Sequence, residues 1–406
     1  MDDQGDAQRT PRRSEGGFPV VGIIGGGQLA RMCQPPAVGL NITLSVLSES
    51  PTASAALVVP HSPVGEAADL DAVLAFAREC DVVTFDHEQV PQSVLHALQA
   101  DGVHLHPDPS ALVYAQDKIA MRRRLSDMGV PCPRWTVAQV VAHVEDFAAE
   151  VGWPIVAKTP RGGYDGKGVR VARSAAELSD WLDRVGENEA SPLADGILLE
   201  EAVPFSREIA VMVARSPSGQ AATWSVVETV QEGGVCTEVL APAPNLPESV
   251  AVAATEAALR IAGELNVTGV MAVEMFEVAG TGGEPGFLVN ELAMRPHNSG
   301  HWSIDGAVTS QFEQHLRAVL DLPLGDTRAR QPWTVMANVL GGEHAELYST
   351  YRHLMARDPG LRVHLYGKSV RPGRKIGHVT TYGDDLDDLR ARGRHAADFL
   401  QGVIDE

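Results

Sequence analysis

The chain contains few cysteines and no long apolar run. Its four cysteines are widely spaced and form no CxxC pair, which excludes a dense disulfide framework and predicts reduced thiols, as in the cytosol. No stretch approaches the roughly 20 apolar residues that a membrane-spanning helix needs. Residues 1–17 are polar, with no apolar centre typical of a secretory signal, and we expect them to form a disordered tail. These absences predict a cytoplasmic protein.

Positive charge is also scarce. The 406 residues include 33 lysines and arginines against 53 aspartates and glutamates, which gives a net charge of −20. A surface of this sign repels nucleic acids and anionic membranes, so we expect neither as a partner. An anionic small molecule remains compatible, because a local basic cluster can outweigh the average. The length suggests two or three domains.

Helical and strand patterns alternate along the chain, which predicts an α/β and α+β protein. The first predicted strands, separated by helical segments in the order typical of an open parallel sheet, are Val20–Ile24, Thr43–Leu47, Asp81–Phe85 and, as a candidate, Val103–Leu105. Pro35 and Pro36 fall in the first helix and predict that it is short or kinked. A single helix is expected over Ala111–Gly129.

The rest of the chain is expected to form two further units. Its predicted strands are Pro154–Thr159, Gly168–Ala172, Gly196–Glu201, Ile209–Ala214, Val270–Val278, Gly286–Glu291, Thr334–Leu340 and Arg362–Tyr366, and its helices are Ala175–Val185, Glu248–Leu265 and Gly383–Gly402. Residues 280–283 are expected at the tip of a hairpin. We place the domain boundaries so that residues 18–112, 113–329 and 330–406 form the three units.

The first candidate site is the glycine run after the first strand. Gly25, Gly26 and Gly27 fit G-x-G-x-x-G/A, and Glu49 follows at about the spacing of a dinucleotide fingerprint. Such a match alone is weak, because backbone amides at a helix N-terminus can hold any phosphate or polar ligand group. An NAD site, a contact with another ligand and a structural turn therefore all stay open.

The second candidate is a glycine-rich loop between two predicted strands. RGGYDGKG, residues 161–168, directly follows the strand that carries Lys158, and it lacks the spacing of a Walker A loop. The amides of Gly163 and Gly166 can approach phosphate oxygens without hindrance from a Cβ atom. A flap that binds a nucleotide is favoured over an ordinary hairpin, because Tyr164, Asp165 and Lys167 accompany the glycines.

Two glutamates form the third candidate. Glu274 and Glu291 are expected on adjacent strands of the glycine-tipped hairpin, among apolar neighbours. Two such carboxylates repel each other unless a cation lies between them, and Mg²⁺ prefers oxygen ligands and often binds phosphates as well. The alternative is a pair of solvated surface glutamates.

Two further polar segments lie near the end of the chain. RPHNSGH follows the second glutamate strand and offers Arg295, His297 and Asn298 as donors for an anion such as bicarbonate. YGKSVRPGRKIGH, residues 366–378, gathers basic residues against the acidic average, and a phosphomonoester is their natural partner. Polar and basic surface loops are the respective alternatives.

Taken in this order, the motifs resemble the ATP-grasp superfamily and in particular the 5-(carboxyamino)imidazole ribonucleotide synthases. The segments GGGQL, TFDHE, KTPRGGYDGKG, NELAMRPHNSGH and YGKSVRPGRKIGH carry the resemblance across about residues 20–380. It implies a pre-ATP-grasp domain, a two-lobed ATP-grasp domain and a small C-terminal domain. It also implies ATP- and Mg²⁺-dependent carboxylation of 5-aminoimidazole ribonucleotide by bicarbonate, through carboxyphosphate, in purine synthesis, and a homodimer.

The resemblance also assigns residue roles. For ATP, Lys118 and Lys158 are expected at the phosphates, Glu208 at the ribose, and the backbone of Glu200, Glu201 and Val203 at adenine. Around the reacting centre, the resemblance implies that Glu274 and Glu291 hold Mg²⁺, with Asn290 as a further candidate ligand, that Arg295, His297 and Asn298 bind bicarbonate, and that Tyr164, Asp165 and Lys167 close over them. At the substrate end, Lys368, Arg374 and Lys375 are expected to bind the ribonucleotide phosphate, and Gln28, Leu29 and Asp86 to line the aminoimidazole pocket. Asp165 and His297 are both candidates for proton transfer.

Some positions depart from the family pattern. Asp86-His87 stands where Glu-Phe is more common, Met294 replaces a proline, and Glu291-Leu292-Ala293 replaces the Glu-x-Asn of many ATP-grasp enzymes. Three alternatives remain open. They are another ATP-grasp ligase or a formate-dependent glycinamide ribonucleotide transformylase, a non-catalytic nucleotide sensor, and an NAD-dependent oxidoreductase.

Overall fold

The computed structural model describes residues 15–163, 168–188, 191–279, 283–342, 344 and 346–405. Most of the expected tail, residues 1–14, lies outside this part, and so does most of the hairpin tip, residues 280–282. Tyr164, Asp165, Gly166 and Lys167 also lie outside the described residues. Within the described part, no helix is long and apolar enough to cross a membrane, and all four cysteines are free thiols.

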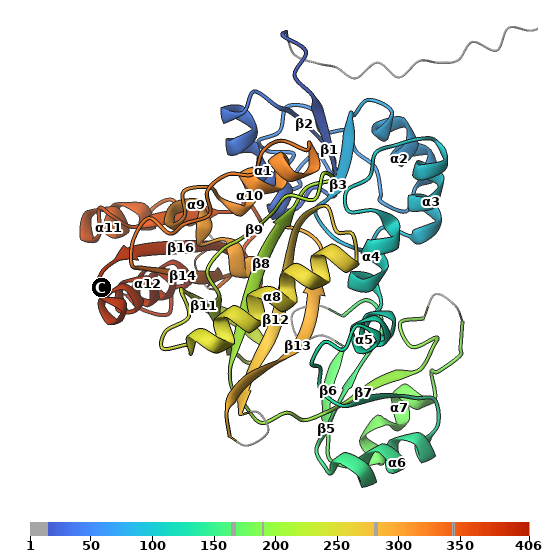
Figure 1. Ribbon diagram of the computed structural model, residues 1–406. Helices are drawn as coiled ribbons and strands as arrows, with labels where there is room; N and C mark the ends of the chain where they lie inside the picture. The colour runs from blue at the N-terminus through green and yellow to red at the C-terminus, as the bar shows by residue number, and fades with distance from the viewer. Residues whose placement is uncertain are drawn as a thin grey trace, which may run out of the picture.

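The N-terminal unit is an open parallel sheet of three strands in the order β2-β1-β3 (Figure 1). Its elements are β1 Val20–Ile24, α1 Gln28–Gly39, β2 Thr43–Leu47, α2 Leu70–Ala77, β3 Val82–Phe85, α3 Gln92–Ala100 and α4 Pro109–Gln116. Every residue of β1 and β3 is buried, as expected of parallel strands covered on both faces. The predicted parallel unit is confirmed.

Two sequence predictions in or near this unit are wrong, and a third is wrong in part. Helix α1 runs for 12 residues through Pro35 and Pro36, so the prolines do not shorten it, and the alternative of a kink stays a prediction. The single helix expected over Ala111–Gly129 is two helices, α4 and α5 Lys118–Asp127, because Asp117 has extended backbone and its carboxylate caps α5 through the amides of Ile119 and Ala120. Val103–Leu105 contributes only an isolated bridge, between Leu105 and Val83.

A smaller lobe follows. Its sheet has the order β4-β7-β5-β6, and its elements are β4 Trp135–Ala138, α6 Val141–Val151, β5 Ile155–Lys158, β6 Val169–Ala172, η1 Ala175–Leu178, α7 Ser179–Leu182 and β7 Ile197–Glu201. One amphipathic helix was expected over Ala175–Val185, but a 3₁₀ turn and a short α-helix share that segment. Figure 1 shows this lobe set apart below the N-terminal unit.

The rest of the described chain is built on a nine-stranded sheet in the order β13-β12-β8-β10-β11-β14-β16-β15, with β9 paired to β8. Its strands are β8 Phe205–Arg215, β9 Ala221–Thr223, β10 Val227–Glu232, β11 Val235–Ala241, β12 Gly269–Ala279, β13 Pro285–Ala293, β14 Trp333–Leu340, β15 Arg362–Leu365 and β16 Lys375–Gly383. Strands β9, β10, β11 and β16 were absent from the sequence prediction. The expected boundary at 329/330 precedes β14, which pairs with β11, so the sheet continues across it.

Helices cover this sheet. They are α8 Glu248–Glu264, η2 Asn298–Gly300, α9 Ser303–Gly306, α10 Gln311–Val319, α11 Thr350–Arg357 and α12 Leu386–Gln401. In Figure 1, α8 lies across β8 and β12, whereas α12 covers the strands of the C-terminal unit. The buried side chains of α8 pack with those of β8 and β12 in the largest hydrophobic core. That core supports the hairpin of β12 and β13, which carries the two glutamates.

Candidate active site

A cleft of about 2000 Å³ lies where the three units meet. Every predicted site residue in the described part of the chain lines it: Gln28, Leu29, Asp86, Lys118, Lys158, Gly163, Glu200, Glu201, Val203, Glu208, Glu274, Asn290, Glu291, Arg295, His297, Asn298, Lys368, Arg374 and Lys375. Residues more than 300 positions apart in the sequence therefore share one cavity.

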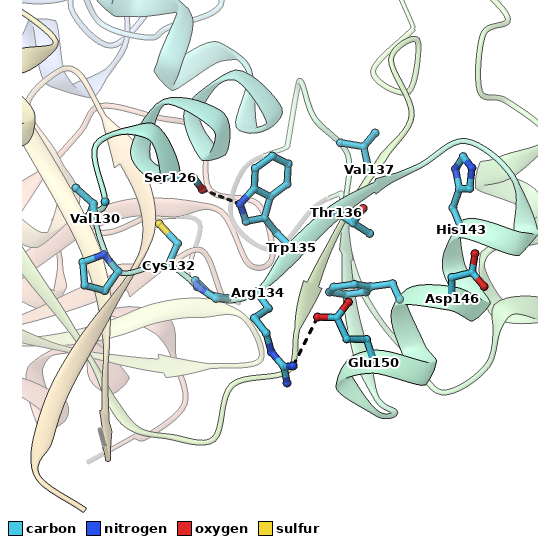
Figure 2. A pocket seen from close by; sticks show the side chains of 14 residues that line it. Ser126, Val130, Cys132, Arg134, Trp135, Thr136, Val137, His143, Asp146 and Glu150 are labelled. Atoms are coloured by element: carbon cyan, nitrogen blue, oxygen red, sulfur yellow. Dashed lines mark hydrogen bonds and ion pairs between the residues drawn. The ribbon is translucent and has the colours of Figure 1, made fainter. Parts of the chain in front are cut away.

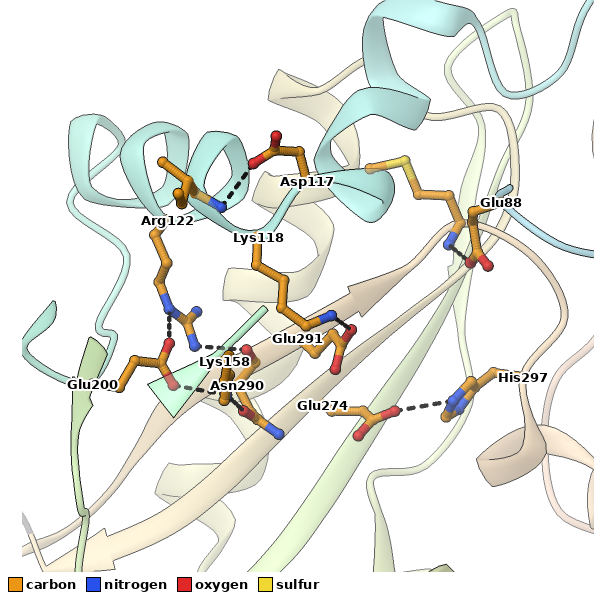
Figure 3. Close-up of polar contacts among 12 residues, drawn as sticks. Glu88, Asp117, Lys118, Arg122, Lys158, Glu200, Glu274, Asn290, Glu291 and His297 are labelled. Carbon is orange, nitrogen blue, oxygen red and sulfur yellow. Dashed lines mark hydrogen bonds and ion pairs between the residues drawn. The ribbon is translucent and has the colours of Figure 1, made fainter. Parts of the chain in front are cut away.

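Glu274 and Glu291 lie directly opposite each other on the antiparallel strands β12 and β13, so their side chains leave the same face of the sheet. Each carboxylate has a basic partner (Figure 3). Lys118 Nζ is 2.5 Å from Glu291 Oε1, and His297 Nε2 is 3.0 Å from Glu274 Oε1. Burial raises the pKa of Glu274, but the bond from His297 and the positive charges of His297, Lys375 and Arg295 together leave this pKa below its usual value. Glu274 is therefore ionised at neutral pH.

A β-bulge places a third potential metal-binding oxygen, from Asn290, beside this pair of carboxylates. Met275 pairs with Val289 and Glu274 pairs with Glu291, so Asn290 is an extra residue on β13. In regular pairing, the neighbours Asn290 and Glu291 would point to opposite faces. At the bulge both line the cleft, as expected where an extra residue redirects a side chain.

This donor set fits Mg²⁺. Two carboxylates and the Asn290 amide oxygen are hard ligands, and Mg²⁺ commonly binds few protein groups and completes its coordination with phosphates and water. The described residues contain no group of three or more histidine, cysteine, aspartate or glutamate side chains arranged to hold a metal ion. An ion held by Glu274, Glu291 and Asn290 would complete its coordination with oxygens of phosphate or water.

Lys158 and Glu200 form a second charged group on the small lobe. Lys158 Nζ lies 2.7 Å from Glu200 Oε2 and donates to Asn290 Oδ1 at 2.9 Å. Arg122 Nε donates to the other oxygen of Glu200 at 2.5 Å. Burial raises the pKa of Glu200, but the charges of Lys158 and Arg122 lower it below its usual value. The Glu200 side chain is therefore committed to an ion pair.

One backbone amide of the expected adenine-binding segment is already bonded within the protein. The amide of Glu201 donates to the Arg134 carbonyl at 2.9 Å, and its carboxylate accepts from Arg134 Nε at 2.8 Å. The Glu201 amide is thus not free to bind an adenine edge, because it extends the small sheet. Val203 follows the end of β7 and lines the cleft, so its backbone stays a candidate for this contact, as do the carbonyls of Glu200 and Glu201.

Glu208, the expected ribose partner, lies on β8 opposite Phe276 of β12. Burial and the nearby charge of Glu274 raise its pKa to about 7. A nucleotide bound with a metal ion would offset the charge of Glu274 and favour ionised Glu208, the form that accepts hydrogen bonds from two ribose hydroxyls.

We predict that Glu208→Gln stabilises the protein at alkaline pH. The folded-state pKa of about 7 exceeds the ordinary 4.5, so the folded protein retains a proton that the unfolded chain has lost, and the free energy of unfolding falls as pH rises from about 4.5 to 7. The glutamine removes this penalty. We expect a gain of ~1 kcal/mol at pH 8 for this partly exposed group, little gain at pH 5, and denaturant titrations to measure both. An equal gain at both pH values would contradict the assignment.

The loop after β13 is held by two partly buried contacts. Arg295 Nε donates to Glu88 Oε2 at 2.7 Å. Gln311 accepts from the His297 amide and donates to the His297 carbonyl, both at 2.8 Å. Sequence reasoning gave neither Glu88 nor Gln311 a role. Glu88 lies in the TFDHE segment, which was a usable signal, whereas no sequence pattern pointed to Gln311.

Asn298 has the features of a ligand-binding residue. Both polar atoms of its side chain are buried and have no hydrogen-bond partner among the residues that the structure describes, although the residue lines the cleft. A buried amide without partners costs about 1–3 kcal/mol. Native proteins retain such a group where a ligand satisfies it, which agrees with the predicted anion contact.

We predict that Asn298→Leu stabilises the free protein and impairs its activity. Replacing an unpartnered amide by an apolar group of similar size should raise the free energy of unfolding by about 1 kcal/mol. The same change should lower kcat/KM at least tenfold through the lost ligand contact. Denaturant titration and steady-state kinetics test the two effects. A loss of stability together with unchanged activity would refute this role.

The substrate end of the cleft joins the first and last units. Lys368 Nζ donates to Gln28 Oε1 at 2.5 Å. The Tyr366 carbonyl accepts from Ser54 Oγ at 2.5 Å. Asp86 accepts from the Ala30 amide at 2.7 Å, and burial raises its pKa. The basic segment thus meets the N-terminal unit at the residues predicted to bind an aminoimidazole.

The glycine run serves packing in this structure. A Cβ atom on Gly27 would lie 1.9 Å from Asp86 Oδ2, so glycine is required there for Asp86 to approach. The Gly26 amide donates to Glu49 at 3.2 Å, and Glu49 faces His87 at 3.8 Å. Glu49 therefore occupies an amide that a dinucleotide phosphate would use, which argues against the NAD alternative.

A second hollow, of about 920 Å³, lies beside α5 and β4 and contains none of the predicted site residues. Figure 2 shows Trp135 Nε1 donating to Ser126 Oγ there, a bond of 3.0 Å, and Arg134 near Glu150 at 3.8 Å. Its polar groups already have protein partners or lie at the surface, so the larger cleft remains the candidate active site.

Comparison with known families defines the class of protein. Residues 19–116 match the ribonucleotide synthetase preATP-grasp domain, residues 123–312 the ATP-grasp domain, and residues 334–392 the phosphoribosylaminoimidazole carboxylase C-terminal domain. This succession of domains is that of an ATP-grasp ligase and confirms the predicted fold.

Individual relatives narrow the assignment. The N5-carboxyaminoimidazole ribonucleotide synthase of Mycobacterium tuberculosis is 51% identical over 97% of this chain and 90% of its own. The ADP complex of an N5-carboxyaminoimidazole ribonucleotide synthetase is 33% identical, with a TM-score of 0.83 over 95% of this chain and 97% of that one. The Aspergillus clavatus enzyme in complex with ADP and 5-aminoimidazole ribonucleotide is 29% identical, with a TM-score of 0.82 and coverages of 94% and 98%. The chain belongs to the N5-carboxyaminoimidazole ribonucleotide synthase family.

Proposed function

We propose that this protein uses ATP to carboxylate the amine of 5-aminoimidazole ribonucleotide with bicarbonate, which gives N5-carboxyaminoimidazole ribonucleotide for purine synthesis. The observation that carries the proposal is the single cleft that joins the paired glutamates of β12 and β13 to the basic segment at Lys368 and Arg374. A related enzyme holds ADP and this ribonucleotide together, which supports the choice of acceptor over glycinamide ribonucleotide.

The nucleotide end is built from both ATP-grasp lobes. Lys118 and Lys158 would neutralise ATP phosphates, and Glu208 would accept from the ribose. Glu274 and Glu291, with Asn290, would hold Mg²⁺, which draws electron density from the phosphates and offsets the charge that develops in transfer. Gly163 and Gly166, with the flap residues Tyr164 and Lys167, would cover the phosphates and exclude water. The roles of the flap residues rest on the sequence alone.

The reaction would begin with attack of a bicarbonate oxygen on the γ-phosphorus of ATP. The bond from this phosphorus to the β–γ bridging oxygen breaks, ADP leaves, and carboxyphosphate forms. Positioning and charge neutralisation are the main needs of such a transfer. Arg295 is partly buried. Burial lowers its pKa, but the carboxylates of Glu88, Asp86 and Glu274 together leave this pKa above its usual value, so the guanidinium is charged. With Asn298, it would orient the bicarbonate and the intermediate.

The amine of the ribonucleotide then binds the carbon of carboxyphosphate, or of the carbon dioxide that it releases, and inorganic phosphate leaves. The amine must also lose a proton. His297 Nδ1 accepts from the Ser299 amide at 3.3 Å and Nε2 faces Glu274 at 3.0 Å. Both ring nitrogens are therefore engaged, and Nε2 is a donor. This favours Asp165 over His297 as the proton acceptor.

Omission of single substrates tests the function. We expect release of ADP with ATP, Mg²⁺, bicarbonate and 5-aminoimidazole ribonucleotide together, and at most slow release when either acceptor is left out. Glycinamide ribonucleotide with formate should not replace them. Rapid ADP release with that pair would favour the transformylase, and no release with any acceptor would favour a nucleotide sensor.

Three finer points belong to the same proposal. The use of Mg²⁺ follows from the oxygen ligands that Glu274, Glu291 and Asn290 offer, and loss of turnover in EDTA with recovery on added Mg²⁺ would test it.

A homodimer follows from the family resemblance, and a cytoplasmic location from that resemblance and the free thiols. Sedimentation velocity would measure the oligomeric state, and a monomer at assay concentrations would contradict it.

A further inference from the structure

Arg122 is a buried cation to which the sequence analysis gave no role. It lies on α5, and its side chain is 0% exposed. Its Nε donates to Glu200, its Nη1 to the Val289 carbonyl at 3.0 Å, and its Nη2 to the Asn290 carbonyl at 2.7 Å. Figure 3 shows the guanidinium reaching from α5 toward Glu200 and Asn290. Burying a charged group is unfavourable without such a set of partners, so its place demands an explanation.

The two carbonyls that Arg122 binds belong to the β-bulge. Strand β13 lies at the edge of the nine-stranded sheet, where outward peptide groups have no neighbouring strand. The Val289 amide on this edge donates to the Pro131 carbonyl at 2.8 Å. Arg122 supplies donors to the Val289 and Asn290 carbonyls, so the extra residue has partners that a flat edge strand would lack.

The same group also fixes the side chain at the bulge. Glu200 binds Arg122 through one oxygen and Lys158 through the other, and Lys158 donates to Asn290 Oδ1. The Asn290 main chain and side chain are thus held by two cations that share one carboxylate. These contacts join α5 and the small sheet to the large sheet, on the two sides of the nucleotide cleft.

We propose that Arg122 is a positioning residue for nucleotide binding, which stabilises the β-bulge and thereby directs Asn290 and Glu291 together into the cleft. The proposal rests on the function proposed above. Arginine is required because its planar fork binds three acceptors at fixed angles, whereas lysine offers a single nitrogen. Arg122→Lys keeps the charge beside Glu200 and cannot hold both carbonyls.

A double-mutant cycle on Arg122 and Asn290 tests this role. The four proteins are the wild type, Arg122→Lys, Asn290→Ala and the double variant, and the probe is MgADP in isothermal titration calorimetry. We expect each single change to weaken MgADP binding about tenfold, the loss of roughly one charge-assisted hydrogen bond. In the Arg122→Lys background, Asn290→Ala should have no further effect, because the amide is already misplaced.

Two outcomes would overturn the proposal. One is wild-type MgADP affinity in Arg122→Lys, which would reduce Arg122 to a counter-ion for Glu200. The other is independent effects, with about a 100-fold loss in the double variant. A purely structural role would lower the unfolding midpoint without this coupling. Should Arg122→Lys not fold, Arg122→Met with Glu200→Gln removes both buried charges and retains an acceptor for Lys158, and the same criteria apply.

The experiment separates this inference from the proposed function. MgADP binding does not depend on the acceptor, so the cycle remains decisive if bicarbonate and the ribonucleotide fail to give turnover. Turnover by the wild type combined with independent effects of the two changes would refute only the role of Arg122. As a kinetic check, Arg122→Lys should raise KM for ATP about tenfold and leave KM for the ribonucleotide within about twofold.

Discussion

Glu291→Gln is expected to abolish ATP turnover while leaving the fold intact. The change removes one of two negative charges that face each other across β12 and β13, and with it a hard ligand for Mg²⁺. Glutamine keeps an oxygen that can accept from Lys118, whose Nζ lies 2.5 Å from Glu291 Oε1. We expect turnover to fall by about 1,000-fold or more, on the order of 4 kcal/mol in the activation barrier, in a coupled ADP assay.

Glu256→Gln is the matched control for this variant. Glu256 is exposed on α8, away from the cleft residues, and its loss changes net charge equally. The control should retain wild-type turnover, and both variants should show wild-type circular dichroism. Wild-type turnover in a folded Glu291→Gln protein would refute the metal assignment and, with it, the proposed phosphoryl transfer.

Arg374→Ala is expected to weaken binding of the ribonucleotide far more than binding of ATP. Arg374 lines the cleft, and its Nη1 donates to Ser369 Oγ at 2.7 Å. Its backbone is held separately, because its carbonyl accepts from the Gly341 amide at 2.7 Å, so the alanine should not unfold the segment. Loss of a charge-assisted phosphate contact of ~1.5–3 kcal/mol predicts a 10- to 100-fold rise in KM for the ribonucleotide.

KM for ATP in the same variant should change by less than about twofold. Arg328→Ala provides the control, because the Arg328 side chain is 77% exposed, lies outside the cleft and carries the same charge. Initial rates with each substrate varied in turn measure both constants. Equal rises in the two Michaelis constants would mean that Arg374 does not distinguish the substrates, and the phosphate site would then have to lie elsewhere.

The sequence predicted the elements whose signals are local. Strands β1 and β2 begin and end at the predicted residues, because short apolar runs bounded by turn residues define buried parallel strands. Strands β10, β11 and β16 were missed. They mix polar and apolar residues, and only their pairing with β8 and β14 makes them strands. The interruption between helices α4 and α5 at Asp117 was also missed. In an amphipathic sequence pattern, a capping aspartate cannot be distinguished from any other polar residue of a helix.

For the candidate site too, local sequence patterns were predictive, whereas contacts between distant residues were not. Motif spacing predicted that Glu274 and Glu291 share the hairpin, and they do. The ion pairs of the Glu200 side chain could not be predicted in this way, because its partners Arg122 and Lys158 lie 78 and 42 residues away in the sequence and meet it only in the fold. The bulge at Asn290 was equally hidden, since one extra residue in a strand leaves no mark in a hydrophobic pattern.

The nine-stranded sheet restricts how this chain can be dissected. Strand β11, before the expected boundary at 329/330, bonds to β14, after it, along four register pairs. Cleavage of the chain at this boundary would leave an unpaired strand edge on each fragment. Such exposed edges pair with other chains and promote aggregation. The segment with Lys368 and Arg374 would leave with the smaller piece. Separate expression of the two fragments should therefore yield aggregates rather than folded domains. The nucleotide end and the ribonucleotide end of the cleft thus depend on the folding of one continuous sheet.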